Sequence, residues 1–106
     1  MKNSPPDELS KEAKTWWRRL VDEYAIEDQA GHLLLQMALQ SFDRMNEARE
    51  LIAKHGAVVT DRWGQLRANP ACTVERDSRA AMLAALKALN LDLEPLRDQP
   101  GRPSGR

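Results

Sequence analysis

Apolar and small residues recur along residues 28–55 with the alternating four- and three-residue steps of a helix that meets a partner helix: Leu34, Ala38, Ser41, Met45, Ala48 and Ile52. Asp28 can cap the first turn by accepting a backbone N–H bond, and Gly56 can take the left-handed conformation that ends a helix. At about 1.5 Å per residue, such a helix is roughly 40 Å long. The pattern therefore predicts one long helix that packs against other helices.

A second apolar face is predicted on the same helix. Residues 33–35 are consecutive leucines, which at ~100° per residue sweep about 200° of the helix surface, and Phe42 extends this face. We expect the helix to pack on two sides, one within its own chain and the other against a second copy. A helix buried in the centre of one small bundle is the alternative that the pattern leaves open. The residues expected at a contact between copies are Leu33, Leu34, Met37, Ser41, Met45 and, from a later turn, Trp63.

An amphipathic pattern also precedes the long helix. Ser10 can act as a cap, and apolar residues follow with helical spacing: Ala13, Trp16, Trp17, Leu20, Val21 and Tyr24. This predicts a helix over residues 10–24. The joint at residues 25–27 is too short to do anything but turn the chain back, so the two helices form a hairpin. Trp16, Trp17 and Tyr24 are expected to pack against the N-terminal half of the long helix, with stacking of the tryptophans on bases as the alternative.

After Gly56 the pattern changes from helical to extended. Residues 57–60 are rich in β-branched side chains, residues 61–64 carry a turn signal, and residues 65–68 complete a small β-hairpin. An isolated two-stranded ribbon is only marginally stable, so we expect it to lean on the helices or to pair with a neighbouring copy. Trp63 at the tip is either a contact for a partner chain or nucleic acid, or a lid on the domain's own core.

Asn69 and Pro70 form a compact helix start, because Asn can cap and Pro at the first helical position needs no N–H partner. A third helix is predicted over residues 70–89, closed by Asn90 in the left-handed conformation with Leu91 folded back. Small residues allow close approach to the long helix: Val74, Ser78, Ala81, Ala85 and Ala88, with Met82, Leu86 and Leu89 beside them. Together these patterns predict a mainly α fold: a helical hairpin with one long central helix, a small β-hairpin and a third, C-terminal helix.

The length of 106 residues fits one domain, which we expect over residues 10–97, between a flexible leader at residues 1–9 and a flexible basic tail at residues 98–106. The formal net charge is zero, which gives no global case for a nucleic-acid partner. The charge is nevertheless uneven. Residues 27–50 hold five acids and two bases, whereas residues 54–79 hold five bases and three acids.

The single cysteine, Cys72, excludes an internal disulfide and fits a reducing compartment. No apolar run approaches the ~18–20 residues that span a bilayer, and the start of the chain lacks the apolar segment of a secretion signal. We therefore expect a soluble intracellular protein without a membrane partner.

No catalytic or metal-binding pattern is found in the sequence. His32 and His55 are about 34 Å apart on the predicted long helix, so they cannot share a metal within one chain. Cys72 near a helix start could have a lowered pKa, but no base partner is visible, and a small buried hydrophobe is the usual role of such a residue. A Gly-rich phosphate loop, a paired-cysteine motif and a Ser-His-Asp order are all absent. We expect no enzymatic activity, no metal and no cofactor.

Four segments carry a family likeness: LSKEAKTWWRRLVDEYAI, DQAGHLLLQMALQSFDRMNEARELIAKHGAVV, RANPA and LKALNLDLEP. In their order and spacing they resemble the terminase small subunits of tailed bacteriophages, over about residues 9–97. Each segment marks a helix boundary rather than a catalytic motif. A typical family member has glycine where this chain has Asn90, a departure that leaves the helix cap intact.

The resemblance implies a non-enzymatic DNA-packaging factor that acts in the host cell cytoplasm. Such a protein forms a homo-oligomeric ring, recognises the packaging start on double-stranded viral DNA, and regulates the large terminase subunit, which holds the ATPase and nuclease. A ring agrees with the second apolar face of the long helix, because a head-to-tail interface that closes gives a ring.

The candidate DNA contacts are basic residues, none of which matches a family motif: Lys11, Lys14, Arg18 and Arg19 on the first helix, Arg62 and Arg67 on the hairpin, and Arg102 and Arg106 on the tail. A neutral chain can bind DNA when a ring repeats a local basic strip many times. Among these candidates we favour the first helix, although a solvated face is the more usual role of such mixed charges. The competing function is a helical adaptor that oligomerises or grips a partner helix without binding DNA. A transcription-type regulator would need a short recognition helix, which the pattern lacks.

Overall fold

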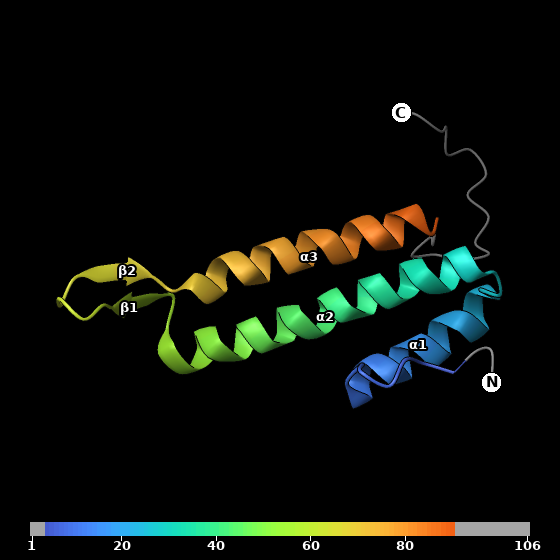
Figure 1. Cartoon of the computed structure of the whole chain (residues 1–106), viewed down its shortest axis with the longest axis horizontal. Helices are drawn as coiled ribbons and strands as arrows, with labels where there is room; N and C mark the ends of the chain where they lie inside the picture. Colours follow the sequence, from blue (N-terminus) through green and yellow to red (C-terminus); the bar gives the residue numbers. More distant parts are fainter. Residues whose placement is uncertain (1–3, 91–106) are drawn as a thin grey trace, which may run out of the picture.

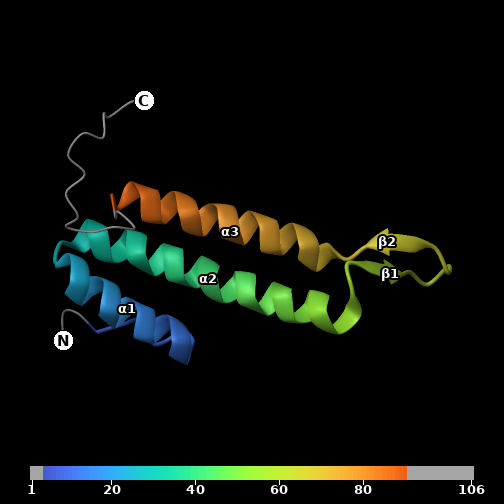
Figure 2. The same cartoon turned by 180° about the vertical axis from the view of Figure 1, so that it is seen from behind.

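The computed structural model describes residues 4–90 as three helices and one β-hairpin. The elements are α1 (Lys11–Tyr24), α2 (Gln29–His55), β1 (Val58–Thr60), β2 (Leu66–Ala68) and α3 (Pro70–Ala88). Helix α3 runs back along α2, and α1 lies against the other side of the N-terminal half of α2, so that α2 is the central rod (Figure 1, Figure 2). The hairpin extends beyond the far end of the rod. The predicted mainly α fold with a small β-hairpin is confirmed.

Each helix begins at the predicted cap. The Ser10 hydroxyl accepts from the Ala13 N–H at 3.1 Å, and the Asp28 carboxylate accepts from the Gly31 N–H at 3.1 Å. Asn69 accepts from the Ala71 N–H at 2.9 Å, and Pro70 stands at the first helical position. These side chains satisfy N–H groups that have no partner inside the helix, which fixes where each helix starts.

The helix ends differ slightly from the prediction. Asn90 has φ 60°, in the left-handed region as expected, although α3 itself ends at Ala88, one residue earlier than predicted. Gly56 has the positive φ of 87° that favours glycine, but its ψ of 165° is extended rather than left-handed helical. The expected left-handed helical cap at Gly56 is therefore wrong, because the chain passes directly into β1 at this point.

The first part of the core lies between α1 and α2. Its buried residues are Leu9, Ala13, Trp17, Val21, Ile26, Leu35 and Leu39, with Phe42 and Tyr24 partly buried beside them. Leu9 was expected in a flexible leader, but only 4% of it is exposed. The preceding Glu8 carboxylate also accepts hydrogen bonds from the side-chain amides of Gln36 and Gln40 on α2. Packing therefore begins before α1.

The two adjacent tryptophans have different surroundings. Trp17 is 3% exposed in the core, whereas Trp16 is 39% exposed, with the Arg19 guanidinium 5.5 Å from its ring centroid. The expectation that both rings pack against α2 is thus confirmed for Trp17 and wrong for Trp16. Consecutive residues on a helix point about 100° apart, so one stripe cannot bury both rings.

The second part of the core is the seam between α2 and α3. On α2 it follows the predicted residues, of which Ala38, Met45 and Ala48 are buried and Ser41 and Ile52 are partly buried. On α3 the seam follows Ala71, Glu75, Ser78, Met82 and Ala85 and the capping residue Leu89, all buried or partly buried, and Cys72 and Leu86 beside this row are partly buried as well. The predicted α3 stripe is therefore only partly right. Ser78 and Ala85 are buried, but Val74, Ala81 and Ala88 are exposed, because the seam passes along a neighbouring row of residues.

Leu35 tests the importance of the α1–α2 core, because it is fully buried on α2. We expect Leu35→Ala to lower the free energy of unfolding by about 2–5 kcal/mol, the range for a buried leucine that leaves a cavity. The matched control is Leu83→Ala on α3, where the side chain is 56% exposed and the expected change is under about 0.5 kcal/mol. Urea unfolding followed by circular dichroism measures both. Equal losses for the two variants would contradict this assignment of the core.

Candidate functional site

His32 and Cys72 have structural surroundings, whereas His55 is exposed at the end of α2. The His32 ring nitrogen Nε2 lies 2.9 Å from the Ile26 carbonyl oxygen, and the ring packs 5.4 Å from the Trp17 ring. Cys72 is partly buried, with its Sγ 3.9 Å from the Ala57 carbonyl oxygen. Within residues 4–90, no group of three His, Cys, Asp or Glu side chains could hold a metal ion. None of the helices described by the structure has the length and apolar character needed to cross a membrane. The candidate sites are therefore surfaces.

Ion pairs identify the two sides of the α2–α3 seam. Arg49 of α2 and Arg79 of α3 both reach the Glu75 carboxylate, at 3.2 and 3.5 Å. Arg49 directly follows the seam residue Ala48, and Arg79 directly follows the seam residue Ser78. On both helices, the residues one position after a seam residue therefore lie on the same side of the seam. Leu35 is also one position past a seam residue and is buried in the core with α1. Helix α1 therefore lies on this side, where it covers the N-terminal half of α2 (Figure 1).

The opposite side of the seam carries apolar side chains that residues 4–90 leave uncovered. On both helices, the residue one position before each seam residue lies on this side. This side also holds the polar residues Gln40, Arg44, Glu47 and Asp77. We call its apolar members, with Leu33 one turn before Met37, the apolar face: Leu33, Met37, Leu51, Val74, Ala81 and Ala88. The four largest are 59%, 51%, 49% and 40% exposed, in the order Leu33, Met37, Leu51 and Val74. Exposed apolar surface of this extent along two helices is typical of an interaction site.

The residues predicted at a contact between copies separate into two groups. Leu33, Met37 and Trp63 are exposed. In contrast, Leu34 and Ser41 are partly buried and Met45 is 4% exposed, at positions of the seam with α3. The two sides of α2 predicted to pack are thus both occupied within the chain, by α1 and α3, and the uncovered apolar face is a third side. The contribution of α3 to this face was missed, because its seam was placed along the wrong row.

The candidate basic residues also have different surroundings. On α1, Lys11, Arg18 and Arg19 are exposed and Lys14 is partly buried, and none of the four makes an ion pair within residues 4–90. Arg67 is neutralised by Asp61 at 3.0 Å. Arg62 lies over the Trp63 ring, 4.8 Å from its centroid. Arg102 and Arg106 lie outside the described residues. The basic strip on α1 is therefore the largest group of candidate cations that no carboxylate neutralises.

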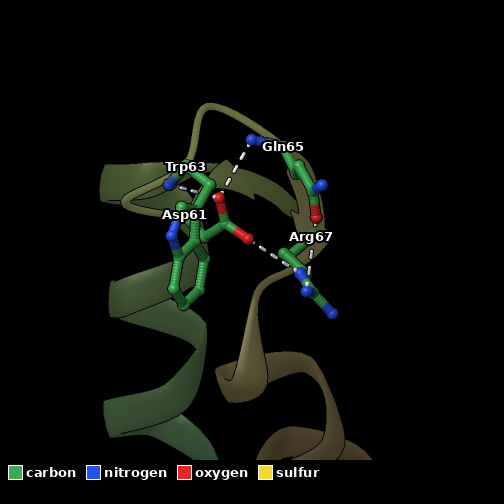
Figure 3. A network of polar contacts seen from close by, with 4 residues as sticks. All are labelled: Asp61, Trp63, Gln65 and Arg67. Carbon is green, nitrogen blue, oxygen red and sulfur yellow. Dashed lines mark hydrogen bonds and ion pairs between the residues drawn. The ribbon is translucent and has the colours of Figure 1, made fainter.

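The tip of the hairpin is organised around Asp61 (Figure 3). One carboxylate oxygen accepts from the backbone N–H groups of Trp63 and Gln65, both at 2.9 Å, and the other accepts from Arg67 Nε at 3.0 Å. These hydrogen bonds lower the pKa of Asp61 below its usual value, with the Gln65 N–H as the largest cause, followed by Arg67 and the Trp63 N–H. Burial acts in the opposite direction and raises the pKa. The network leaves the Trp63 side chain 70% exposed at the end of the molecule.

At its base the hairpin is fixed by Asn69, which is 8% exposed. Its side-chain amide donates to the Gly56 carbonyl at 2.8 Å, and its backbone N–H donates to the Ala57 carbonyl at 2.7 Å. The same residue caps α3. One residue thus ties the end of α2, the start of β1 and the start of α3 together.

The Asp61 network predicts a pH dependence of the tip. Because the folded-state pKa of Asp61 is lowered, the network stabilises the hairpin above the usual carboxyl pKa and this stabilisation is lost as the pH falls through the lowered value. We expect the amide proton resonances of Trp63 and Gln65 to shift together at a pH below that at which an ordinary aspartate titrates. In Asp61→Asn this transition should vanish. A Trp63 amide that titrates at or above the usual pKa would contradict the network.

Comparison with known proteins identifies the family to which the chain belongs. Searches of curated proteins and of solved structures gave no significant match. Residues 13–95, however, match the family described as phage terminase, small subunit. The match begins inside α1, continues past the end of α3, and covers well over half of the chain. The chain therefore belongs to the family of phage terminase small subunits.

Proposed function

We propose that this protein is a non-catalytic DNA-packaging factor that assembles into a homo-oligomeric ring. In this role it binds the packaging start site on viral DNA in the host cytoplasm and regulates the large terminase subunit, which supplies ATPase and nuclease activity. Membership of the terminase small subunit family supports a role in packaging in general. The single observation that carries the assembly is the uncovered apolar face of α2 and α3.

The position of the apolar face supports a repeated contact between copies. It lies along both long helices, on the side away from α1, and none of the helices described over residues 4–90 covers it. Covering an exposed leucine or methionine side chain contributes about 1.5–3 kcal/mol, which favours association. When one surface of a subunit contacts a different surface of the next, the contact repeats, and it closes into a ring if the rotation allows.

DNA binding is proposed for α1. Because α1 lies on the other side of the seam, association through the apolar face leaves Lys11, Arg18 and Arg19 accessible. One copy offers only a few cations, but a ring repeats them, and affinity for DNA rises with the number of phosphates that are neutralised. A helical adaptor that oligomerises without binding DNA remains the second candidate, and it is favoured by the formal net charge of zero.

The assembly is tested by placing charge on the apolar face. We expect the double variant Met37→Glu, Leu51→Glu to lower the mass measured by light scattering towards that of the monomer, because carboxylates would be buried without partners. The helix content measured by circular dichroism should not change, since both side chains are about half exposed. The control is Leu83→Glu, which carries the same charge on an exposed apolar position of α3 outside the face. If the double variant keeps the wild-type mass, this face is not the interface.

The DNA role is tested by reversing charge on α1. We expect Lys14→Glu, Arg18→Glu to reduce retention on duplex DNA and to make the logarithm of the binding constant less steep against the logarithm of salt concentration. Arg76→Glu on α3 is the control, because Arg76 is exposed and paired with Asp77. Unchanged DNA retention and salt slope in the α1 variant would remove α1 as the DNA surface. A wild-type assembly that ignores DNA at every salt concentration would favour the adaptor.

A further inference from the structure

We propose that the hairpin tip of one copy, through Trp63 and Arg62, docks beside Glu27 at the opposite end of a second copy. The occupant of the surface beside Glu27 is thus another copy of the same chain, bound head to tail. This inference rests on the proposed assembly and names a contact that would hold it together. The argument combines the presentation of the tip, the shape and charge of the receiving end, and the geometry of a repeated contact.

The hairpin tip presents side chains that residues 4–90 leave exposed. It extends past the ends of α2 and α3, and the Asp61 network holds its backbone in one conformation (Figure 1, Figure 3). Trp63 is 70% exposed and Leu66 on β2 is 75% exposed. A rigid, exposed Trp beside an Arg is the combination most often found at the energetic centre of protein interfaces, because little conformational entropy is lost on binding.

The receiving end is hollowed on both sides of Glu27, where the chain turns from α1 into α2. One hollow of about 390 Å³ is lined by Glu27, Gln29, His32, Leu33 and Gln36. A second hollow of about 340 Å³ is lined by Arg18, Val21, Asp22, Ala25 and Glu27. Both combine apolar and polar side chains, as an amphipathic indole requires. Leu33 belongs also to the apolar face, so the first hollow continues that face.

The charges of the two ends are complementary. Asp22, Glu23 and Glu27 make no ion pair within residues 4–90, and Arg18 is the one cation among the residues that line the two hollows. Asp22 and Glu23 also lie in the last turn of α1, where the helix dipole disfavours negative charge. They therefore gain from a cation that arrives from outside. Arg62 at the other end has no carboxylate partner among the described residues and lies over the Trp63 ring.

The same charges favour a protein rather than DNA as the partner of the tip. Arg67, the other cation of the hairpin, is neutralised by Asp61, which leaves Arg62 as the one unpaired cation of residues 57–68. A single cation is a weak site for the phosphate backbone, because nucleic-acid affinity depends on several neutralised phosphates. One cation beside an aromatic ring fits a hollow that contains a few carboxylates.

The two ends lie at opposite extremes of α2, which determines the kind of assembly (Figure 1, Figure 2). A tip that binds the opposite end of the next copy leaves its own receiving end free for a third copy. When a third copy fills that end, the contact is heterologous and can close into a ring; when two antiparallel copies fill each other's receiving ends, it closes as a dimer. Two hairpins that paired with each other would instead give a closed dimer.

Charge reversal on each end tests the contact. We expect Arg62→Glu alone and Glu27→Lys alone to raise the concentration for half-assembly, measured by light scattering, roughly tenfold or more, since like charges then meet. A mixture of the two variants should recover assembly. The tip of Arg62→Glu then meets the lysine of Glu27→Lys, and the native tip of Glu27→Lys meets the native Glu27 of Arg62→Glu. Trp63→Ala should weaken assembly without recovery on mixing. Circular dichroism confirms that each variant is folded.

Matched controls separate this contact from general charge effects and from the apolar face. Arg76→Glu and Glu50→Lys, at exposed positions, should assemble as the wild type does. A wild-type protein that stays monomeric at every concentration would overturn the proposed ring itself. With wild-type assembly intact, unchanged assembly of Arg62→Glu together with reduced DNA retention would overturn the head-to-tail contact and make the tip a DNA contact. Failure of the mixture to recover would overturn the proposal as well.

Discussion

Helix α2 must bury two adjoining sides along 27 residues, and the chain has unequal helices with which to cover them. Helix α3, at 19 residues, follows most of the rod, whereas α1, at 14 residues, covers only its N-terminal half. The aromatic volume of the core is concentrated under α1, at Trp17, and the rest of the rod relies on small side chains. Close approach of α2 and α3 is possible because alanine and serine occupy much of their seam. Among residues 4–90, no helix covers the third side of α2.

The local features of the fold could be predicted from the sequence because their causes are local. Ser10, Asp28 and Asn69 have side chains that accept N–H groups of the first helical turn, so each marked a helix start correctly. Residues 57–68 formed the expected hairpin, because a β-branched run and a turn signal act over a few residues. The positive φ of Asn90 followed from the same kind of reasoning.

The packing of the helices could be predicted only in part, because it depends on partners that a periodicity does not identify. On α3, alanines occupy two neighbouring rows, so the row with Val74, Ala81 and Ala88 and the row with Ala71 and Ser78 could not be ranked by hydrophobicity. Glu75 lies in the seam because two arginines reach its carboxylate, a requirement that apolar spacing cannot show. Leu9 lies before the first cap, and only the arrival of α1 on α2 makes it part of the core.

The formal net charge of zero hides an uneven distribution of charge along the molecule. The carboxylates beside the α1–α2 joint and the cation of the hairpin tip lie at opposite ends, so a head-to-tail contact brings them together. In such an assembly, Arg62 of the neighbour would add a cation beside Asp22 and Glu27, while Lys11 and Arg19 on α1, which line neither hollow, would keep their charge. The proposed contact would therefore reduce the acidic charge beside the basic strip of α1. Binding to the phosphate backbone would then depend on assembly in two ways. Assembly sets the number of basic strips, and it neutralises acidic side chains near each strip.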